Sequence, residues 1–399
     1  MLLKIVWKNL AAKKLTSFLC IVLMMFGICI ISLVITIGKQ LEDKFSKNIS
    51  GIDMVVGAKG SPLQLILSGV YQIDAPTGNI LLTEASKISE NPLVKEFIPI
   101  SMGDNYQGFR IIGTNKKYIE HYKATYYDGQ LFNDTKQVVL GSSVSKKLEL
   151  KLGDSFSSSH GFKEEGEVHE DGKLIVIGIL NHNNSVIDNL ILTSLETVWN
   201  VHEHEEGQNQ SLIEVDSLKK EITCALVKFR SPMGLMTIPR NINSNTKMQA
   251  ALPAIEINRL FELMGIGIDA INLLAFAIIL ISGISVFVTL YNSLKERKYE
   301  MALMLSMGAK RTKLFVMLLL EGLFLSLIGY VLGILLSRIG LYLTSRALES
   351  NMNYTLNQIV LQKEEIILLI GALLVGIFAA AIPSLGVYRI NISKTLAND

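Results

Sequence analysis

The residues whose side chains are best suited to metal binding are histidines. The chain has six, and all of them lie between residues 121 and 204. Neutral imidazole is a common zinc ligand, so we identify a candidate zinc site in His182, His202 and His204. The alternative is an ordinary solvated loop, because no strict zinc-ligand spacing is present. A His-x-His pair also places both rings on one side only in an extended segment and not in a helix.

Signatures of self-contained catalysis are missing from the sequence. It contains no Gly-x-x-x-x-Gly-Lys-Ser/Thr phosphate loop, and the nearest glycine-rich stretch, 57–61, has the wrong spacing. No nucleophile elbow, His-Glu-x-x-His pair or paired-carboxylate pattern is present either. We therefore predict that the chain is not an enzyme, has no catalytic residues and binds no cofactor of its own apart from the candidate zinc.

A second group of polar residues lies in a short basic stretch. Residues 295–307 are helix-forming throughout, and Gly308 follows at the position where a left-handed C-cap is usual. Helical spacing separates apolar from polar side chains, namely Met301 and Met304 from Glu296 and Glu300. Taken alone, the pattern fits either a helix that lies on the lipid surface without a binding role or a helix that docks on a cytoplasmic partner.

The elements around this stretch are strongly apolar. Hydrophobic residues make up 49% of the chain and the mean hydropathy is +0.37, which is high for a soluble domain. Four runs are long and apolar enough for membrane-spanning helices, namely 15–38, 266–291, 314–337 and 364–388. A signal peptide is the alternative for the first run. Because its apolar part is longer than a typical signal-peptide core and no small-x-small cleavage site follows, we expect this run to be a retained membrane anchor.

The third run contains a carboxylate and several glycines. A carboxylate in the hydrocarbon core costs about 2.5–3.5 kcal/mol on insertion scales, so we expect Glu321 to face protein or the headgroup layer. Gly329 and Gly333 are spaced for the close approach of another helix, and Gly322 directly follows the carboxylate. We predict that these four residues serve helix packing.

Basic residues are unevenly distributed over the segments that join the runs. Twelve lie before the first run, between the second and third, or after the fourth, and three lie between the third and fourth. The positive-inside rule places both termini in the cytoplasm and the long segment outside, as in a bacterial inner-membrane protein. A net charge of +2 gives no case for nucleic acid. The remaining segments are an amphipathic elbow over 1–14, an outer domain over 39–265, a cytoplasmic loop over 292–313, a short outer loop over 338–363 and a tail over 389–399.

The fold class is therefore a four-helix membrane protein with a large α+β domain between the first and second spans. Short apolar runs predict strands in this domain, for example at 138–141 and 174–180. The segment 64–80 is either an ordinary core segment or part of a seam between two copies. The polar, turn-rich segment 161–172 is predicted to be an exposed loop. Cys224 is predicted to be a buried core residue.

The cytoplasmic stretch resembles the FtsX-like, or MacB-type, ABC permeases. Their hallmark, Glu-Arg-x-x-Glu-x-Ala-x-x-x-x-x-Gly-Ala, is matched by Glu296, Arg297, Glu300, Ala302, Gly308 and Ala309. An acidic residue before a glycine-rich helix continues the hallmark, as Glu321, Gly322, Gly329 and Gly333 do here. In the outer domain, 138–154 resembles the family's strand, Gly-Ser, helix and Leu-x-x-Gly-Asp unit. The likeness covers one span, the large domain and three further spans.

The resemblance implies that 295–308 is a coupling helix that docks on a separate ATPase subunit through Glu296, Arg297, Glu300, Met301, Met304 and Gly308. It also implies pairing with a second copy or a paralogue, and a distal part of the outer domain at about 134–216. By mechanotransmission, the complex would export or release a periplasmic or outer-leaflet substrate, with a periplasmic protein as a further partner. The alternatives are a regulator of an outer partner such as a cell-wall hydrolase, and a metal-handling assembly.

Overall fold

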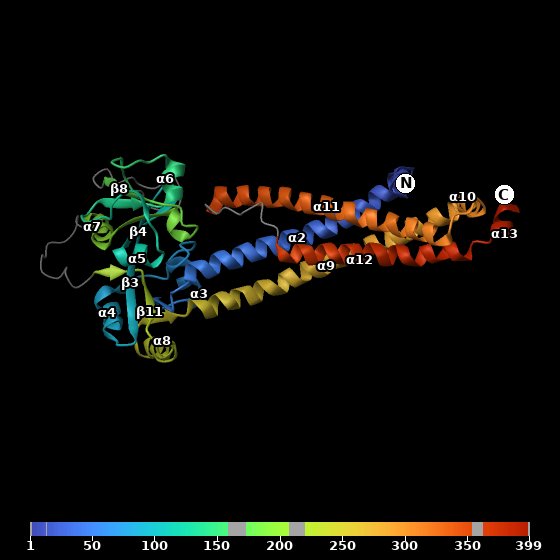
Figure 1. Ribbon diagram of the computed structural model, residues 1–399. Helices are drawn as coiled ribbons and strands as arrows, with labels where there is room; N and C mark the ends of the chain where they lie inside the picture. Colours follow the sequence, from blue (N-terminus) through green and yellow to red (C-terminus); the bar gives the residue numbers. More distant parts are fainter. Residues whose placement is uncertain (1, 13, 159–172, 207–219, 353–361, 398–399) are drawn as a thin grey trace. The chain divides into compact units, whose positions relative to one another are not determined.

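The computed structural model describes residues 2–12, 14–158, 173–206, 220–352 and 362–397 (Figure 1). The chain forms two compact units. The helical unit consists of Met1–Glu42 and Leu263–Asp399, and the α+β unit of Asp43–Glu262. The predicted loop 161–172 lies outside the described residues.

Long helices dominate the helical unit. Among the described residues, four helices are long and apolar enough to cross a membrane, which confirms the predicted number of spans. They are α2 (Lys14–Ile49), α9 (Pro253–Glu296), α11 (Arg311–Met352) and α12 (Lys363–Leu385). Shorter helices flank them: α1 (Leu2–Ala12), α10 (Lys298–Ser306), the 3-10 helix η4 (Gly386–Arg389) and α13 (Ile392–Ala397).

The helices extend beyond the apolar runs that predicted them. In particular, α11 continues to Met352, so the predicted outer loop 338–363 is helical over its first part. The run ends at Arg338 in the sequence, but this arginine is ion-paired with Glu365 at 2.6 Å. Arg338 therefore lies inside α11 and faces α12.

Glycines set the distances between the long helices. A Cβ on Gly329 would lie 2.7 Å from Met24 of α2, and one on Gly333 would lie 2.7 Å from Ile28. Gly322 makes the corresponding approach to α12, where Ala380 would be 2.6 Å away. Each distance is shorter than real Cβ atoms tolerate, so the small residues permit contacts that any side chain would block. The predicted packing role of these glycines agrees with their positions.

A ten-stranded sheet forms the centre of the α+β unit. Its strand order is β12-β1-β11-β3-β4-β9-β6-β8-β5, with β7 paired to β8. The strands are β1 (Met54–Ala58), β3 (Val94–Tyr106), β4 (Phe109–Thr114), β5 (Tyr126–Gly129), β6 (Gln137–Leu140), β7 (Ser155–Phe156), β8 (Leu174–Leu180), β9 (Leu190–Ser194), β11 (Cys224–Phe229) and β12 (Met248–Ala251). A separate pair joins β2 (Ile80–Leu81) to β10 (Glu221–Ile222).

Helices pack around these strands. They are α3 (Pro62–Gly69), α4 (Leu82–Ser86), α5 (Lys116–His121), α6 (Ser142–Leu148), α7 (Leu195–Glu206) and α8 (Met233–Asn245), with 3-10 turns η1 (Lys87–Glu90) and η2 (Val186–Asn189). α3 buries Leu65 and Ile66 in the core of the unit, so the segment 64–80 begins as a core helix. Cys224 is fully buried as predicted, and burial raises the pKa of its thiol to about 12.

The sheet divides into two parts at its longest strand. β3 pairs with β11 through residues 94–100 and with β4 through residues 101–106. We call β12, β1 and β11 the proximal part and β4, β9, β6, β8 and β5 the distal part. The predicted insertion at about 134–216 does not coincide with this division, because β4 and β5 precede residue 134. β4 pairs with β9 as well as with β3, and β5 pairs with β8, and local patterning does not reveal these partners from later in the chain.

Candidate functional site

The hallmark residues lie where α9 ends and α10 begins. Glu296 is the last residue of α9, and Arg297, with φ −101° and ψ 14°, interrupts the helix before α10 starts at Lys298. The predicted helix 295–307 is therefore shorter than expected, and its first residues belong to the membrane helix. Glu300 lies in the first turn of α10, with 62% of its side chain exposed.

One face of α10 is buried within the helical unit. Met301 and Ala302 are fully inaccessible, and Leu305 is nearly so. They share an apolar cluster with Val6 of α1 and Leu318 of α11. Met304 packs against the same cluster from a half-buried position. This differs from the predicted coupling role of Met301 and Met304, because the methionine face is already covered by other segments of the same chain.

The opposite face of α10 is exposed and apolar. Tyr299, Leu303 and Met307 are 43%, 45% and 80% exposed. Their spacing of four residues aligns them on one side of the helix and its C-cap. We call these three side chains the α10 stripe. Sequence reasoning missed it because a helix with apolar residues on two sides does not reveal which side the fold covers. The signal was present as the i, i+4, i+8 repeat itself.

α10 ends in a Schellman motif. Gly308 has φ +94°, its N–H donates to Leu305 O at 3.1 Å, and the N–H of Ala309 donates to Met304 O at 2.9 Å. A residue with a Cβ is strained at this φ, so the glycine is required by the turn. The predicted stop at Gly308 is confirmed, and the motif fixes Met307 at the exposed tip of the helix.

A polar network connects α10 to the neighbouring helices. Arg297 Nε donates to Glu300 at 3.1 Å, and its Nη1 lies 3.7 Å from the Glu321 carboxylate. Glu321 is 2% exposed and accepts a hydrogen bond from the Asn9 amide at 2.6 Å. Glu321 therefore faces protein, as predicted. Asn9 was not anticipated, because nothing in its surroundings in the sequence marks it as a partner of a residue in α11.

The C-terminal segment closes the same end of the helical unit. Arg311, the first residue of α11, donates to the carbonyl oxygens of Tyr388 and, at 3.2 Å, of Ile390. The Phe315 ring lies 5.8 Å from the Tyr388 ring. α10 also contacts α13. α10 is thus held on several sides and presents the stripe from a fixed position.

A second polar network lies elsewhere in the helical unit. Glu365, at the start of α12, is fully buried and accepts two hydrogen bonds from Arg338, at 2.6 and 2.7 Å. Ser32 of α2 donates to the same carboxylate at 2.6 Å and lies 2.9 Å from the hydroxyl of Ser337. The network ties α2, α11 and α12 together. The sequence does not reveal this network, because Arg338 falls in the predicted outer loop 338–363.

The candidate zinc ligands are not brought together by any contact the structure describes. His182 Nδ1 lies 3.0 Å from Asp188, and its side chain is 61% exposed. His202 and His204 lie in α7, whose backbone is helical, and their side chains are outside the described residues. No group of metal-ligating side chains occurs among the residues that the structure describes, and the zinc site stays a prediction.

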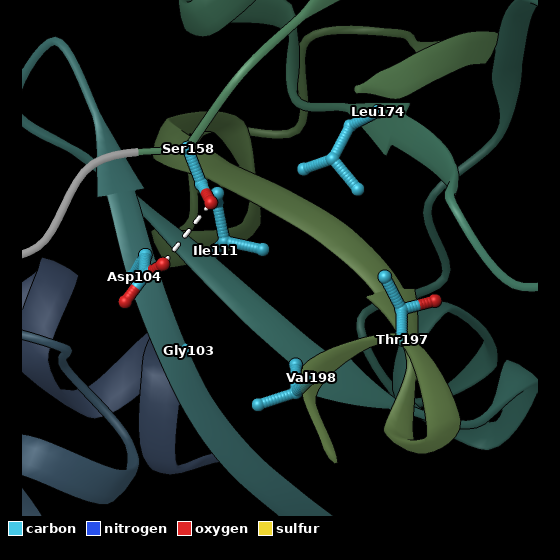
Figure 2. A pocket seen from close by; sticks show the side chains of 7 residues that line it. All are labelled: Gly103, Asp104, Ile111, Ser158, Leu174, Thr197 and Val198. Atoms are coloured by element: carbon cyan, nitrogen blue, oxygen red, sulfur yellow. Dashed lines mark hydrogen bonds between the residues drawn. The ribbon is translucent and has the colours of Figure 1, made fainter. Parts of the chain in front are cut away.

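The α+β unit contains a small cavity between β3, β4 and α7. Figure 2 shows its lining, which includes Gly103, Leu174 and Val198. Ser158 donates to Asp104 at its edge, at 3.0 Å. The volume is about 10 Å³, room for about one water molecule. This cavity is too small for a solute.

Comparisons with known proteins agree with this organisation. The model of the FtsX-like permease C-terminal region matches residues 272–392, and the model of the MacB-like periplasmic core domain matches residues 17–231. A protein described as an uncharacterized ABC transporter permease of Methanocaldococcus jannaschii is 23% identical over an alignment 425 positions long, gaps included, which covers 98% of this chain and 96% of the relative.

Two solved structures also resemble the chain. The periplasmic region of MacB from Actinobacillus actinomycetemcomitans matches with a TM-score of 0.36 and 14% identity, covering 55% of this chain and 98% of that one. The extracellular domain of the noncanonic ABC-type transporter YknZ from Gram-positive bacteria matches with a TM-score of 0.31 and 14% identity, covering 49% and 98%.

Proposed function

We propose that this chain, which belongs to the ABC transporter permeases of the MacB/FtsX type, transmits ATP-driven movement from a separate cytoplasmic ATPase subunit to its α+β unit. The movement exports or releases a substrate from the periplasm or the outer leaflet. An ABC permease implies a partner ATPase, and the sequence contains no phosphate loop of its own.

The observation that carries this proposal is the α10 stripe. Exposed aromatic and long apolar side chains on a rigid helix are typical of interface anchors. Because Met301, Ala302 and Leu305 hold the other face of α10 in an apolar cluster, a push on the stripe moves the whole helix. Glu300, beside the stripe, adds a charged contact at the rim. These features support docking of the ATPase on Tyr299, Leu303 and Met307.

The distribution of basic residues supports the orientation of the chain. Arg338 is paired with Glu365 inside the helical unit, so it does not count as a free loop charge. When Arg338 is left out of the count, the excess of basic residues in the N-terminal segment, the α9–α11 connection and the C-terminal tail becomes larger. We infer that both termini and α10 lie in the cytoplasm of a bacterial cell, that the α+β unit lies outside, and that two permease chains pair in the complex.

The test is purification of the complex in detergent after changing the stripe. Leu303→Asp places a carboxylate at the centre of the docking surface, where burying an unpaired charge costs several kcal/mol. We expect normal membrane levels and at least a tenfold loss of co-purified ATPase, which corresponds to about 1.4 kcal/mol. Met307→Asp is expected to act in the same direction.

The matched control is Met236→Asp in α8, because Met236 is 79% exposed but belongs to the α+β unit. It is expected to leave ATPase binding unchanged. Retention of the ATPase by both stripe variants would remove the coupling role of α10, and so would equal losses in the stripe variants and the control.

A further inference from the structure

The last two turns of α2 belong to the α+β unit. The Phe45 ring packs against the rings of Tyr71 and Phe261, at centroid distances of 4.5 and 5.8 Å. The Tyr71 hydroxyl also donates to the Phe45 carbonyl at 2.9 Å. Since α2 is one uninterrupted helix from Lys14 to Ile49, a movement of the helix reaches these turns directly.

The same end of α2 is bonded to the connection between β8 and β9, residues 181–189. Asn48 is 7% exposed, and its Oδ1 accepts a hydrogen bond from the backbone N–H of Val186 at 3.0 Å. Lys47 Nζ donates to the carbonyl oxygen of Asn183 at 2.6 Å. Two consecutive residues of α2 therefore hold one segment of the distal part.

This segment is held by hydrogen bonds and contacts the start of α6. Asp188 is 3% exposed and accepts from the N–H of Asn184 at 2.6 Å and from the hydroxyl of Ser142 at 3.1 Å. A Cβ on Gly141 would lie 2.3 Å from a carbonyl oxygen of η2, so α6 approaches the segment as closely as a glycine permits. A displacement of the segment therefore moves α6 and the distal strands with it.

α9 enters the α+β unit beside the end of α2. It begins at Pro253, directly after β12, which is the edge strand of the proximal part. Ile257, in its second turn, is buried in the core. Both long helices thus pack into one core, where the Phe45 ring of α2 meets the Phe261 ring of α9. β3 is the strand that joins the proximal and distal parts, with a register irregularity between Met102 and Asn105.

We propose that Asn48 and Lys47 form a latch through which a movement of α2 reaches the distal part of the sheet. This proposal rests on the proposed function, because it assumes that ATP-driven movement reaches α2. The two side chains are positioning residues. They contact neither ATPase nor substrate, and they determine where the movement of α2 is delivered.

Hydrogen–deuterium exchange on the full-length chain with its co-purified ATPase tests the latch, with and without a non-hydrolysable ATP analogue. In the wild type, we expect the analogue to change exchange over 181–189 and over α6. In Asn48→Ala, the Val186 amide loses its acceptor, so we expect about fivefold faster exchange there at rest. The response of α6 to the analogue should disappear, while ATPase binding and hydrolysis persist.

Further variants separate positioning from simple stability. Asn48→Asp keeps an acceptor oxygen in place and is expected to restore the α6 response. Asn241→Ala removes an exposed asparagine of α8 whose hydrogen bond stays within its own helix, and it is expected to change nothing. If Asn48→Ala does not fold, Lys47→Ala gives the decisive result, because its side chain is exposed and its loss should still reduce the α6 response.

The outcomes are distinct. An α6 response in Asn48→Ala as large as in the wild type overturns the latch and leaves the proposed function intact. A wild-type complex that hydrolyses ATP without any change over 181–189 also overturns the latch alone. A wild-type chain that binds no ATPase overturns the proposed function and the latch together.

Discussion

Two buried carboxylates of the helical unit are held in different ways. Glu365 accepts two short hydrogen bonds from Arg338 and a third from Ser32. Glu321 accepts a hydrogen bond from Asn9, whereas Arg297 stands 3.7 Å away in a looser ion pair. Short charge-assisted hydrogen bonds, such as those from Arg338 Nη2 to both Glu365 oxygens, resist separation, and a longer pair separates at lower cost. The Glu365 network therefore belongs to the fixed frame of the helices, and the Glu321 network, next to α10, is suited to change during coupling.

The strongest test of this comparison is Arg338→Ala. It leaves Glu365 fully buried without its ionic partner, so we expect a loss of about 3–5 kcal/mol in the free energy of unfolding. Unfolding in detergent micelles measures the loss. The double variant Arg338→Met with Glu365→Leu removes both charges and is expected to recover most of the stability. A loss below about 1 kcal/mol in Arg338→Ala would show that the pair is not part of the frame.

Arg297→Ala is expected to have a smaller effect on stability and a larger one on coupling. Glu321 keeps its hydrogen bond from Asn9, so the loss should be about 1–3 kcal/mol. Because Arg297 joins α10 to α11, permease-dependent stimulation of the ATPase should fall at least tenfold, and the assay compares hydrolysis with and without the permease. Equal losses of stability in Arg297→Ala and Arg338→Ala would remove the distinction between the two networks.

Asn9→Ala tests the hydrogen bond from α1. Its amide reaches Glu321 at 2.6 Å, and removing a donor to a charged group costs about 1.5–3 kcal/mol at most. We expect a loss near the lower end, because the ion pair with Arg297 persists. Combining Asn9→Ala with Arg297→Ala should cost more than the sum of the single losses, since both side chains act on the same buried Glu321 carboxylate. Strict additivity in this double-mutant cycle would contradict a shared network.

Glu300→Gln should have the smallest effect on stability. Its ion pair with Arg297 is exposed, and such pairs contribute about 0–1 kcal/mol. We expect a change of the melting temperature close to the error of the measurement, together with a modest, salt-dependent loss of ATPase binding. A large loss of stability would mean that Glu300 belongs to the same buried network as Glu321.

Local patterning predicted several elements of the α+β unit well. The strand expected at 174–180 matches β8, and the Gly-Ser pair at 141–142 does open a helix. Such elements depend on the alternation of side chains within a few residues. The division of the sheet at β3 was not predicted, because it depends on whether β4 pairs only with its neighbour in sequence or also with β9, about 80 residues later.

In the candidate site, too, local patterns predict the elements but not which side chains the fold covers. The helix, its stop at Gly308 and the protein-facing position of Glu321 all follow from composition and spacing. The choice of the exposed face does not. Met301 and Leu303 are both apolar, and the packing of α1, α11 and the C-terminal segment covers Met301 and leaves Leu303 accessible.

The sequence alone determined the four spans, the α+β class and the family, because long apolar runs and a specific hallmark are local properties of the chain. The tertiary structure decided which charges are paired and which faces are covered. From the sequence, Arg338 looks like a loop cation, and only the fold places Glu365 of α12 beside it. Likewise, Asn48 looks like an ordinary residue at a helix end, and only the fold places Val186 of the distal part beside it. Partners separated by tens or hundreds of residues meet only when the whole core has formed, and no window of sequence contains that information.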